Sequence, residues 1–283
     1  MMHVDAAIPD PERAAAIAPD TPHFFRRTIP GDLAGVVERI VGYQENGQAL
    51  RQAPEIAALV VPLVINLSDP FEIAFGRSPT AEDRYFSFTS GLYPGFLLIN
   101  STGAALCVQI DFTPIGAYRF FGLPMSELAG AMVTLEDLSD IGICELREQI
   151  ASLNNWDARL ELVEEFVRRR IRRSQAATAP VQKAYETILR HDGLARVGEI
   201  AASLDWSRKH LNQRFRELVG VGPKTVSRMA RFNNAVRIAH AGVSNSWADI
   251  AYAAGYADQA HLAREFMEFS GSTPSRLPEP LYR

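Results

Sequence analysis

The sequence predicts an α+β protein with a β-rich N-terminal half, helices after it and an all-α C-terminal domain. At 283 residues the chain exceeds the usual size of a single domain. The first half contains apolar and polar residues in strand-like alternation, and after about Thr134 helix-forming residues replace that pattern. The C-terminal part contains an internal duplication of helical units. The expected organisation is a flexible arm at 1–20, a β-rich domain at 21–140, a helical pair at 141–174 and a helical domain at 180–283.

The composition of the first twenty residues and of the whole chain indicates which class of protein this is. Residues 1–20 are rich in Pro and Ala and lack periodicity, which is typical of a flexible arm. A content of 47% hydrophobic and 22% charged residues indicates a globular protein. The longest apolar run, Ile56 to Leu67, is interrupted by Pro62 and Asn66 and is too short to span a bilayer. No secretory signal pattern opens the chain. We therefore expect a cytoplasmic protein with no membrane partner.

Alternation of apolar and polar residues predicts strands in the 21–140 region. Between Leu106 and Phe112 every second residue is apolar, which is the period of a half-buried strand. The turn residues Ser68-Asp69-Pro70 separate two strand-like runs, 63–67 and 71–75, and so predict a hairpin. Short strands at this spacing favour a compact all-β sandwich or barrel.

Two amphipathic helices follow in the 141–174 region, separated by Asn154-Asn155. Their apolar faces recur at helical spacing: Leu146, Ile150 and Leu153 in the first, and Leu160, Val163, Phe166, Val167 and Ile171 in the second. Two such helices either pack as an antiparallel pair or contact a second subunit, which would make the chain a homodimer through 141–174. The small, polar stretch from Ser174 to Pro180 is the expected linker to the C-terminal domain.

The net charge of −4 conceals an asymmetry along the chain. Up to Ala179 there are 15 Lys and Arg against 23 Asp and Glu, whereas from Pro180 onward there are 14 against 10. An excess of basic residues is what a phosphate backbone attracts. A further cluster precedes this boundary and is either an extension of the basic part or a solvated helix face: Arg168, Arg169, Arg170, Arg172 and Arg173.

The duplication is the most informative feature of the C-terminal part. Ile200-Ala201 recurs as Ile250-Ala251, and Trp206 recurs as Tyr256, at an offset of 50 positions. One inserted residue then makes the offset 51. The later pairs are His210-Leu211 with His261-Leu262, Phe215 with Phe266, Gly220 with Gly271, and Pro223 with Pro274.

Each copy is predicted to be two helices joined by a short turn. Ser207 and Asp258 are the capping residues of the two second helices. Spacing of i, i+4, i+7 predicts the buried faces: Leu211, Phe215 and Leu218 in one copy, and Leu262, Phe266 and Phe269 in the other. The opposite faces carry side-chain types that read base edges in the major groove: Arg208, Lys209, Asn212, Gln213 and Arg216, then Gln259, His261 and Arg264.

A long helix is expected between the two copies. Pro223 suits a first helical turn, and the stretch that it opens remains helical to about Ala241. Such a helix would hold two groove-reading elements about 28 Å apart, close to the ~34 Å pitch of DNA. Ser246 and Asp249 form a capping box that starts the next helix.

These residues resemble a known protein family. The stretch from about Pro180 to Leu277 resembles the DNA-binding domain of the AraC/XylS family of bacterial regulators. The matching positions are Asp249-Ile250-Ala251-Tyr252-Ala253-Ala254-Gly255-Tyr256, Gln259, His261-Leu262, Arg264, Phe266, Gly271 and Thr273-Pro274. The resemblance implies a transcription regulator whose partner is double-stranded DNA. It also implies that Lys209, Asn212, Gln213, Gln259, His261 and Arg264 are base readers. Arg196-Val197 departs from a well-capped helix start, and Ala260 and Ala263 leave the second reader helix sparse.

The same resemblance implies a cupin-like sensor in the N-terminal half that binds a small-molecule effector or mediates dimerisation. The stretch from Phe112-Thr113-Pro114 to Phe120-Phe121-Gly122, followed by Leu135-Glu136-Asp137-Leu138, is similar to a sensor variant of some family members. Seven aromatic residues at strand spacing either line a pocket or form plain core: Phe71, Phe75, Tyr85, Phe86, Phe88, Tyr93 and Phe96.

An enzyme or repair protein that carries a DNA-binding domain is the alternative. The N-terminal half holds only His3 and His23, with no H-x-H, so neither a metal site nor a cofactor is expected. Nucleophile and phosphate-loop motifs are absent from the sequence. Alkyl-transfer repair needs reactive cysteines, whereas Cys107 lies in a predicted strand and Cys144 precedes a predicted helix. We therefore predict a regulator rather than an enzyme.

Overall fold

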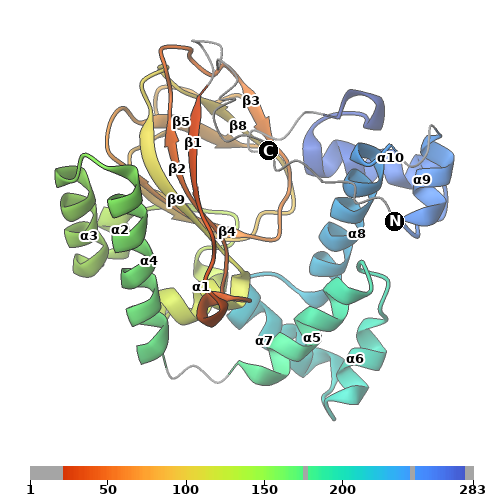
Figure 1. The fold of residues 1–283 in the computed structure, drawn as a ribbon. Helices are drawn as coiled ribbons and strands as arrows, with labels where there is room; N and C mark the ends of the chain where they lie inside the picture. The colour runs from red at the N-terminus through yellow and green to blue at the C-terminus, as the bar shows by residue number, and fades with distance from the viewer. Residues whose placement is uncertain (1–21, 175–177, 243–245, 278–283) are drawn as a thin grey trace, which may run out of the picture.

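The computed structural model describes residues 22–174, 178–242 and 246–277. Strands dominate the first part of the described chain, helices follow them, and a separate group of helices forms the C-terminal part (Figure 1). The predicted α+β class is confirmed, with a β-rich N-terminal part and an all-α C-terminal part. The predicted arm at 1–20 lies outside the described residues, and so does part of the predicted linker, at 175–177.

Antiparallel strands form two sheets in the described N-terminal part. The larger sheet has the order β1 (His23–Arg27), β2 (Val37–Gln44), β9 (Leu106–Phe112), β4 (Val61–Asn66), β7 (Phe88–Ser90) and β10 (Met132–Thr134). The smaller sheet has the order β3 (Ala53–Glu55), β8 (Leu97–Asn100), β5 (Phe71–Phe75) and β6 (Arg84–Tyr85). Side chains from both sheets meet between them, including Val64 of β4 and Ile73 of β5. Of the two predicted arrangements, a sandwich or a barrel, the two facing sheets form a sandwich.

Strand β9 is buried on both faces, although its alternation predicted a half-buried strand. Its apolar residues Val108, Ile110 and Phe112 pack in the core that the helices cover. Cys107 and Asp111, on the other face, are also buried. The half-buried expectation was wrong because the smaller sheet covers the face that would otherwise meet water.

The predicted hairpin around Ser68-Asp69-Pro70 was also wrong. Both of its strands exist, as β4 and β5, but β4 pairs with β9 and β7, whereas β5 pairs with β8 and β6. The turn therefore carries the chain from one sheet to the other. A turn sequence specifies a reversal of direction, but the partner of each strand depends on long-range packing.

Helices cover the outer face of the larger sheet. They are α1 (Pro114–Phe121), α2 (Leu135–Leu138), α3 (Ile141–Ser152) and α4 (Trp156–Arg173), with the 3-10 turns η1 (Gly31–Leu33) and η2 (Met125–Glu127). Trp156 stacks on Phe25 of β1 with ring centroids 4.6 Å apart. Helices α3 and α4 pack against each other, which is one of the two predicted arrangements. A homodimer through 141–174 stays a prediction.

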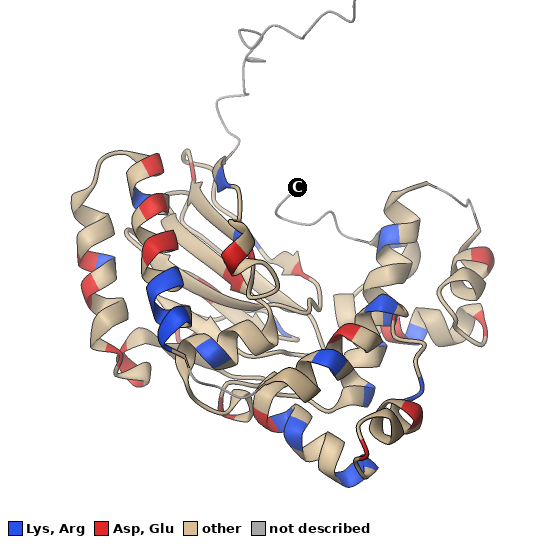
Figure 2. Cartoon of the chain, turned by 60° about the horizontal axis from the view of Figure 1, so that its bottom comes forward, with Lys and Arg blue, Asp and Glu red and all other residues tan. Residues whose placement is uncertain are grey.

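The arginine cluster of α4 mainly holds the N-terminal part together. Arg168 bonds Glu164, Glu165 and Asp32, and Arg172 also reaches Asp32. Arg170 pairs with Asp140. Figure 2 shows these basic residues at the end of α4, next to the β-rich part. Arg168, Arg170 and Arg172 are thus ion-paired within the N-terminal part, whereas Arg169 and Arg173 are exposed on the same helix.

The C-terminal part consists of helices packed on two cores. The helices are α5 (Ala179–Arg190), α6 (Val197–Ser203), α7 (Arg208–Val219), α8 (Pro223–His240), α9 (Trp247–Ala253) and α10 (Gln259–Ser270), followed by the 3-10 turn η3 (Pro274–Arg276). The core of α5, α6 and α7 is continuous with that of the larger sheet, and α7 contacts α1 and η2. A second core joins α8, α9 and α10. Among the described residues, none of the helices combines the length and the hydropathy that a membrane span requires.

Candidate nucleic-acid interface and N-terminal pocket

The first helical unit is built from α6, a tight turn and α7. The Ser207 hydroxyl accepts the backbone N–H of His210 at 3.1 Å and so caps α7 as predicted. The Trp206 N–H returns to the carbonyl oxygen of Ala201 at 2.9 Å, which closes the turn. The indole of Trp206 meets the ring of His210 edge-on, with centroids 4.5 Å apart. The start of α6 has no side-chain cap at Arg196, as its sequence indicated.

The second unit repeats this geometry with α9 and α10. Ser246 caps α9, and Asp258 caps α10 by accepting the N–H of His261 at 2.7 Å. The Tyr256 N–H bonds the carbonyl oxygen of Ala251 at 2.8 Å. The rings of Tyr256 and His261 meet edge-on, with centroids 5.2 Å apart. The residues that recur in the sequence therefore make the same hydrogen bonds and ring contacts in both units.

One residue of each turn has a left-handed backbone. It is Asp205 in the first unit, with φ of 54°, and Gly255 in the second, with φ of 75°. Glycine adopts this conformation freely, and aspartate is among the few other residues that tolerate it. These two residues are also 50 positions apart, so the duplication includes a backbone requirement that the residue types alone conceal.

The predicted inward faces are confirmed. Each triplet is fully buried: Leu211, Phe215 and Leu218 of α7, and Leu262, Phe266 and Phe269 of α10. Phe266 and Phe269 both contact Phe232 of α8, with ring centroids 5.0 and 5.3 Å apart. The positions of α7 and α10 that face solvent follow directly from this packing.

Seven of the eight predicted contact residues are exposed on α7 and α10, and His261 is half-buried. The side chains of five of them have no hydrogen-bond or ion-pair partner within the described parts of the chain: Lys209, Gln213, Arg216, Gln259 and Arg264. These five polar side chains are available to an external ligand.

The other three predicted contact residues lie against neighbouring parts of the protein. A Cβ built on Gly198 would be 2.7 Å from Nη2 of Arg208, so this guanidinium covers the start of α6. A Cβ on Gly222, in the turn before α8, would be 2.6 Å from Oδ1 of Asn212. His261 is held between the Tyr256 ring and Glu265, with Nε2 3.7 Å from Oε1.

Helix α8 is continuous between the two units, as predicted, and a buried carboxylate joins it to α10. Glu265 accepts from Nε of Arg228 at 2.8 Å, from Nη2 of Arg231 at 3.1 Å and from the Tyr256 hydroxyl at 2.9 Å. These bonds satisfy the carboxylate, which is otherwise costly to bury. Arg228 and Arg231 therefore bind within the protein and hold α10 against α8.

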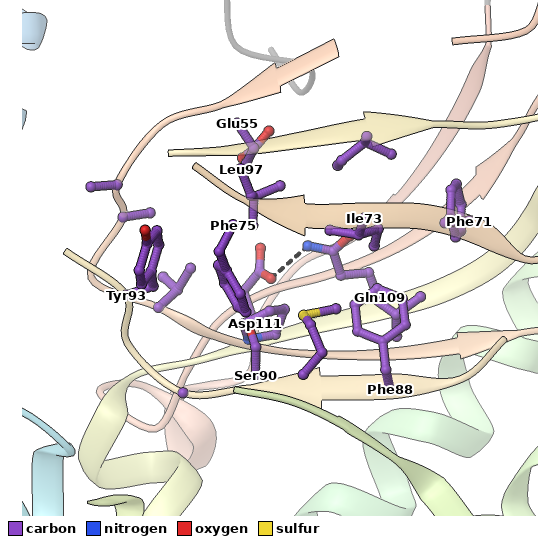
Figure 3. A pocket seen from close by; sticks show the side chains of 18 of the residues that line it. Glu55, Phe71, Ile73, Phe75, Phe88, Ser90, Tyr93, Leu97, Gln109 and Asp111 are labelled. Carbon is purple, nitrogen blue, oxygen red and sulfur yellow. Dashed lines mark hydrogen bonds between the residues drawn. The ribbon is translucent and has the colours of Figure 1, made fainter. Parts of the chain in front are cut away.

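A pocket lies between the two sheets of the N-terminal part (Figure 3). It has a volume of about 130 Å³. Four of the seven aromatic residues singled out in the sequence line it: Phe71, Phe75, Phe88 and Tyr93. The other three, Tyr85, Phe86 and Phe96, do not belong to this lining. Its floor includes Cys107, Gln109 and Asp111, the face of β9 that was predicted to meet solvent.

Three charged residues line this pocket. Arg39 of β2 and Asp111 of β9 are register partners, and Nε of Arg39 donates to Oδ2 of Asp111 at 2.8 Å. Gln109 donates to the other oxygen of Asp111 at 2.7 Å. The third, Glu55, ends β3 on the smaller sheet, and among the described residues nothing donates to its buried Oε2. Burial raises the pKa of Glu55 to about 7, against the opposing effect of Arg39.

The segment that follows Glu55 is shared by the pocket and the C-terminal helices. Ile56 and Ala57 line the pocket and also pack on the core of α8, α9 and α10. The backbone N–H of Ala57 donates to the carbonyl oxygen of Phe269 in α10 at 2.8 Å. The Tyr185 hydroxyl of α5 donates to the carbonyl oxygen of Leu59 at 3.4 Å.

The two cysteines are not bonded to each other and differ in burial. Cys107 is buried, and burial raises the pKa of its thiol to about 12, which keeps it protonated. Cys144 is half-buried. No group of His, Cys, Asp and Glu within the described ranges is arranged to hold a metal ion.

Comparison with known proteins assigns the duplicated region. Residues 200–279 match the family model described as a helix-turn-helix domain. This region is an AraC-type helix-turn-helix domain. The AraC-type domain includes both capped helices, α7 and α10, and the whole of α8 between them.

The solved structures that resemble this chain are more distant. Fatty acid-bound wild-type ToxT from Vibrio cholerae has 10% identity and a TM-score of 0.45, over 88% of this chain and 96% of that one. ToxT from Vibrio cholerae O395 has 13% identity and a TM-score of 0.43, over 91% and 96%. A search of curated proteins gives no match.

Sequence reasoning missed two residues that organise the AraC-type domain and the pocket. Glu265 occupies a position on α10 that the spacing assigns to neither the core nor the outward face, and its three partners come from elsewhere in the chain. Glu55 lies in a short strand without clear alternation. Glu55 is an acidic residue between the apolar neighbours Pro54 and Ile56, and this is the signal that it leaves in the sequence.

Proposed function

We propose that this protein is a sequence-specific, DNA-binding transcription regulator whose two helix-turn-helix units read neighbouring stretches of the major groove. One observation carries the proposal: two copies of the same capped helix, α7 and α10, each present unpaired polar side chains opposite a fully buried face. A helix in the major groove reads bases through side chains on the outward face of its first turns.

Helix α8 supports a common register for the two units. Its 18 residues span about 27 Å, close to the ~34 Å that separate successive major-groove entries on one face of DNA. Glu265 and its two arginine partners attach α10 to this helix. A rigid connection lowers the entropy that is lost when both units engage one duplex.

The eight exposed or half-buried polar residues divide into two groups in this proposal. Lys209, Gln213, Gln259 and Arg264 have free side chains and are assigned to base edges, and Arg216, further along α7, to phosphate. The remaining three keep their predicted role of contacting DNA, but each must leave an intramolecular contact to do so: Arg208, Asn212 and His261.

The pocket between the sheets supports regulation by a small-molecule effector. Its wall includes Ile56 and Ala57, which also contact the second unit. A molecule that moves this segment changes the contact between Ala57 and Phe269 and so biases the position of α10. An effector shifts such an equilibrium only through different affinities for the two arrangements. We place the regulator in the cytoplasm, with the DNA, and retain a homodimer through 141–174 in the proposal.

The proposal is tested by selecting binding sites for the full chain from a random DNA pool. We expect enrichment of a two-part site, with the parts about one helical turn apart. A double variant, Lys209→Ala with Arg264→Ala, is expected to lose this enrichment. Arg51→Ala with Arg84→Ala is the matched control, because it removes two exposed positive charges from the N-terminal part instead. Enrichment of no sequence by the folded wild-type chain would refute the proposal.

A further inference from the structure

The volume of the pocket between the sheets and the charged residues that line it favour one class of ligand. Its volume of about 130 Å³ is close to the ~150 Å³ of an apolar cavity that takes up benzene. Phe75 and Tyr93, whose ring centroids lie 4.5 Å apart, supply aromatic surface toward one end of the pocket, and Phe71 and Phe88 supply it toward the other (Figure 3). A ligand ring gains both burial and edge or face contacts in such surroundings. The apolar part of the pocket therefore suits a single ring.

When Glu55 is ionised, the charged residues that line the pocket carry a net charge of −1. Arg39, Asp111 and Glu55 are the charged residues of the lining. Arg39 and Asp111 neutralise each other through a bond of 2.8 Å, and Gln109 satisfies the second oxygen of Asp111. The carboxyl group of Glu55 is left over, with an oxygen that receives no hydrogen bond from the described residues.

A buried acceptor without a donor costs free energy, and a ligand that donates to it recovers that free energy. A cationic donor also compensates the charge, and such charge-assisted bonds are the stronger kind. An anionic ligand would instead add a second uncompensated negative charge beside Glu55, because Arg39 is already paired with Asp111.

We propose that this pocket binds a compact aromatic amine, with its ring beside Phe75 and Tyr93 and its ammonium group donating to Glu55 Oε2. The role of this amine as an effector rests on the function proposed above, whereas its binding does not. Burial raises the pKa of Glu55 to about 7, so the free pocket holds the carboxyl group partly protonated near neutral pH. A bound ammonium group stabilises the carboxylate form.

Three single-ring probes of nearly equal size separate charge from shape. They are benzylamine, benzyl alcohol and benzoate, each titrated calorimetrically into the full chain. We expect benzylamine to bind at least about tenfold more tightly than benzoate, with benzyl alcohol between them. Glu55→Gln is expected to abolish the preference for the amine while leaving benzyl alcohol binding in place, which also shows that the variant is folded.

Glu82→Gln is the matched control, because it removes an exposed carboxylate that does not line the pocket. It is expected to bind all three probes like the wild type. The inference is overturned if benzoate binds as tightly as benzylamine, if the preference for the amine survives Glu55→Gln, or if none of the probes binds. Fluorescence anisotropy with the selected DNA, with and without benzylamine, is a separate measurement. Amine binding without any change in DNA affinity would sustain the ligand class and remove only its effector role.

Discussion

Ala57, at the edge of the pocket, donates its backbone N–H to the carbonyl oxygen of Phe269, at the end of the second reader helix, at 2.8 Å. The two residues are more than two hundred positions apart in the sequence. Gly271, just beyond this helix, lies against the ring of Phe96, since a Cβ there would be 2.9 Å from it. The N-terminal part thus contacts the AraC-type domain at the helix assigned to DNA reading.

Removing the Ala57 hydrogen bond is expected to loosen the end of α10. Ala57→Pro lacks the N–H and should cost about 1 kcal/mol, the usual net value of one hydrogen bond. Hydrogen exchange of the amides around Phe269 and Gly271 should become faster. Ala57→Gly retains the donor and is the control. Equal exchange in the proline variant and the wild type would show that this bond does not hold the helix end.

Arg264 is expected to read a base. It is exposed on α10 and has no ion-pair partner in the described residues. Arg264→Ala should weaken binding to the preferred site by roughly 1 to 3 kcal/mol and relax the preference at one base position. Site selection with the variant measures this. A uniform loss of affinity with the wild-type sequence profile would reassign Arg264 to phosphate.

Arg216 is expected to behave differently, because it lies further along α7 from the Ser207 cap. Arg216→Ala should weaken binding about equally across sequences. The slope of log affinity against log salt should fall by about one unit, as for the loss of one phosphate contact. Anisotropy titrations at several salt concentrations provide the measurement. An unchanged salt slope combined with an altered base preference would contradict the assignment.

The two equivalent phenylalanines, Phe215 and Phe266, are expected to contribute similarly to the stability of their units. Phe215 and Phe266 are fully buried, and truncation of a packed Phe to Ala removes apolar burial and leaves a cavity. Each substitution should lower the free energy of unfolding by about 3 to 5 kcal/mol. Urea unfolding of the full chain is the measurement, with the highly exposed Tyr252→Ala as control. A loss no greater than that of the control would mean that the inward face is assigned wrongly.

Glu55 is expected to make the fold less stable as the pH rises. Burial raises its pKa from an ordinary 4.5 to about 7, with Asp111 adding to the effect and Arg39 opposing it. Between pH 4.5 and about pH 7, Glu55 is mostly ionised in the unfolded chain but still protonated in the folded chain. The contribution of Glu55 to the free energy of unfolding therefore falls as the pH rises through this range. The free energy of unfolding of Glu55→Gln minus that of the wild type should therefore be more favourable at about pH 8 than at about pH 4. The expected change in this difference is on the order of 3 kcal/mol.

Urea unfolding of both chains at the two pH values measures that difference, and the other titrating groups cancel in the comparison. Glu82→Gln serves again as control, because its carboxylate is exposed. The same stability difference between Glu55→Gln and the wild type at both pH values would exclude a raised pKa for Glu55.

The duplicated helical units could be predicted from the sequence because their signals are local. Ser207 and Asp258 cap the helices that follow them, and the i, i+4, i+7 spacing of Leu262, Phe266 and Phe269 identifies the buried face without reference to the rest of the chain. The continuous helix that begins at Pro223 follows from the same local rules.

The sequence by itself therefore determined the fold class, the two helix-turn-helix units and the outward residues that they present. Only the tertiary structure decided which strands pair across Ser68-Asp69-Pro70, that the second face of β9 lines a pocket, and that Arg168 and Arg170 bind acidic partners within the protein. It also brought Glu55 into a cavity and Glu265 to three partners. The physical reason is that capping and helical periodicity act within a few residues, whereas strand pairing, burial of charge and cavity shape depend on residues that meet only when distant parts of the chain pack together.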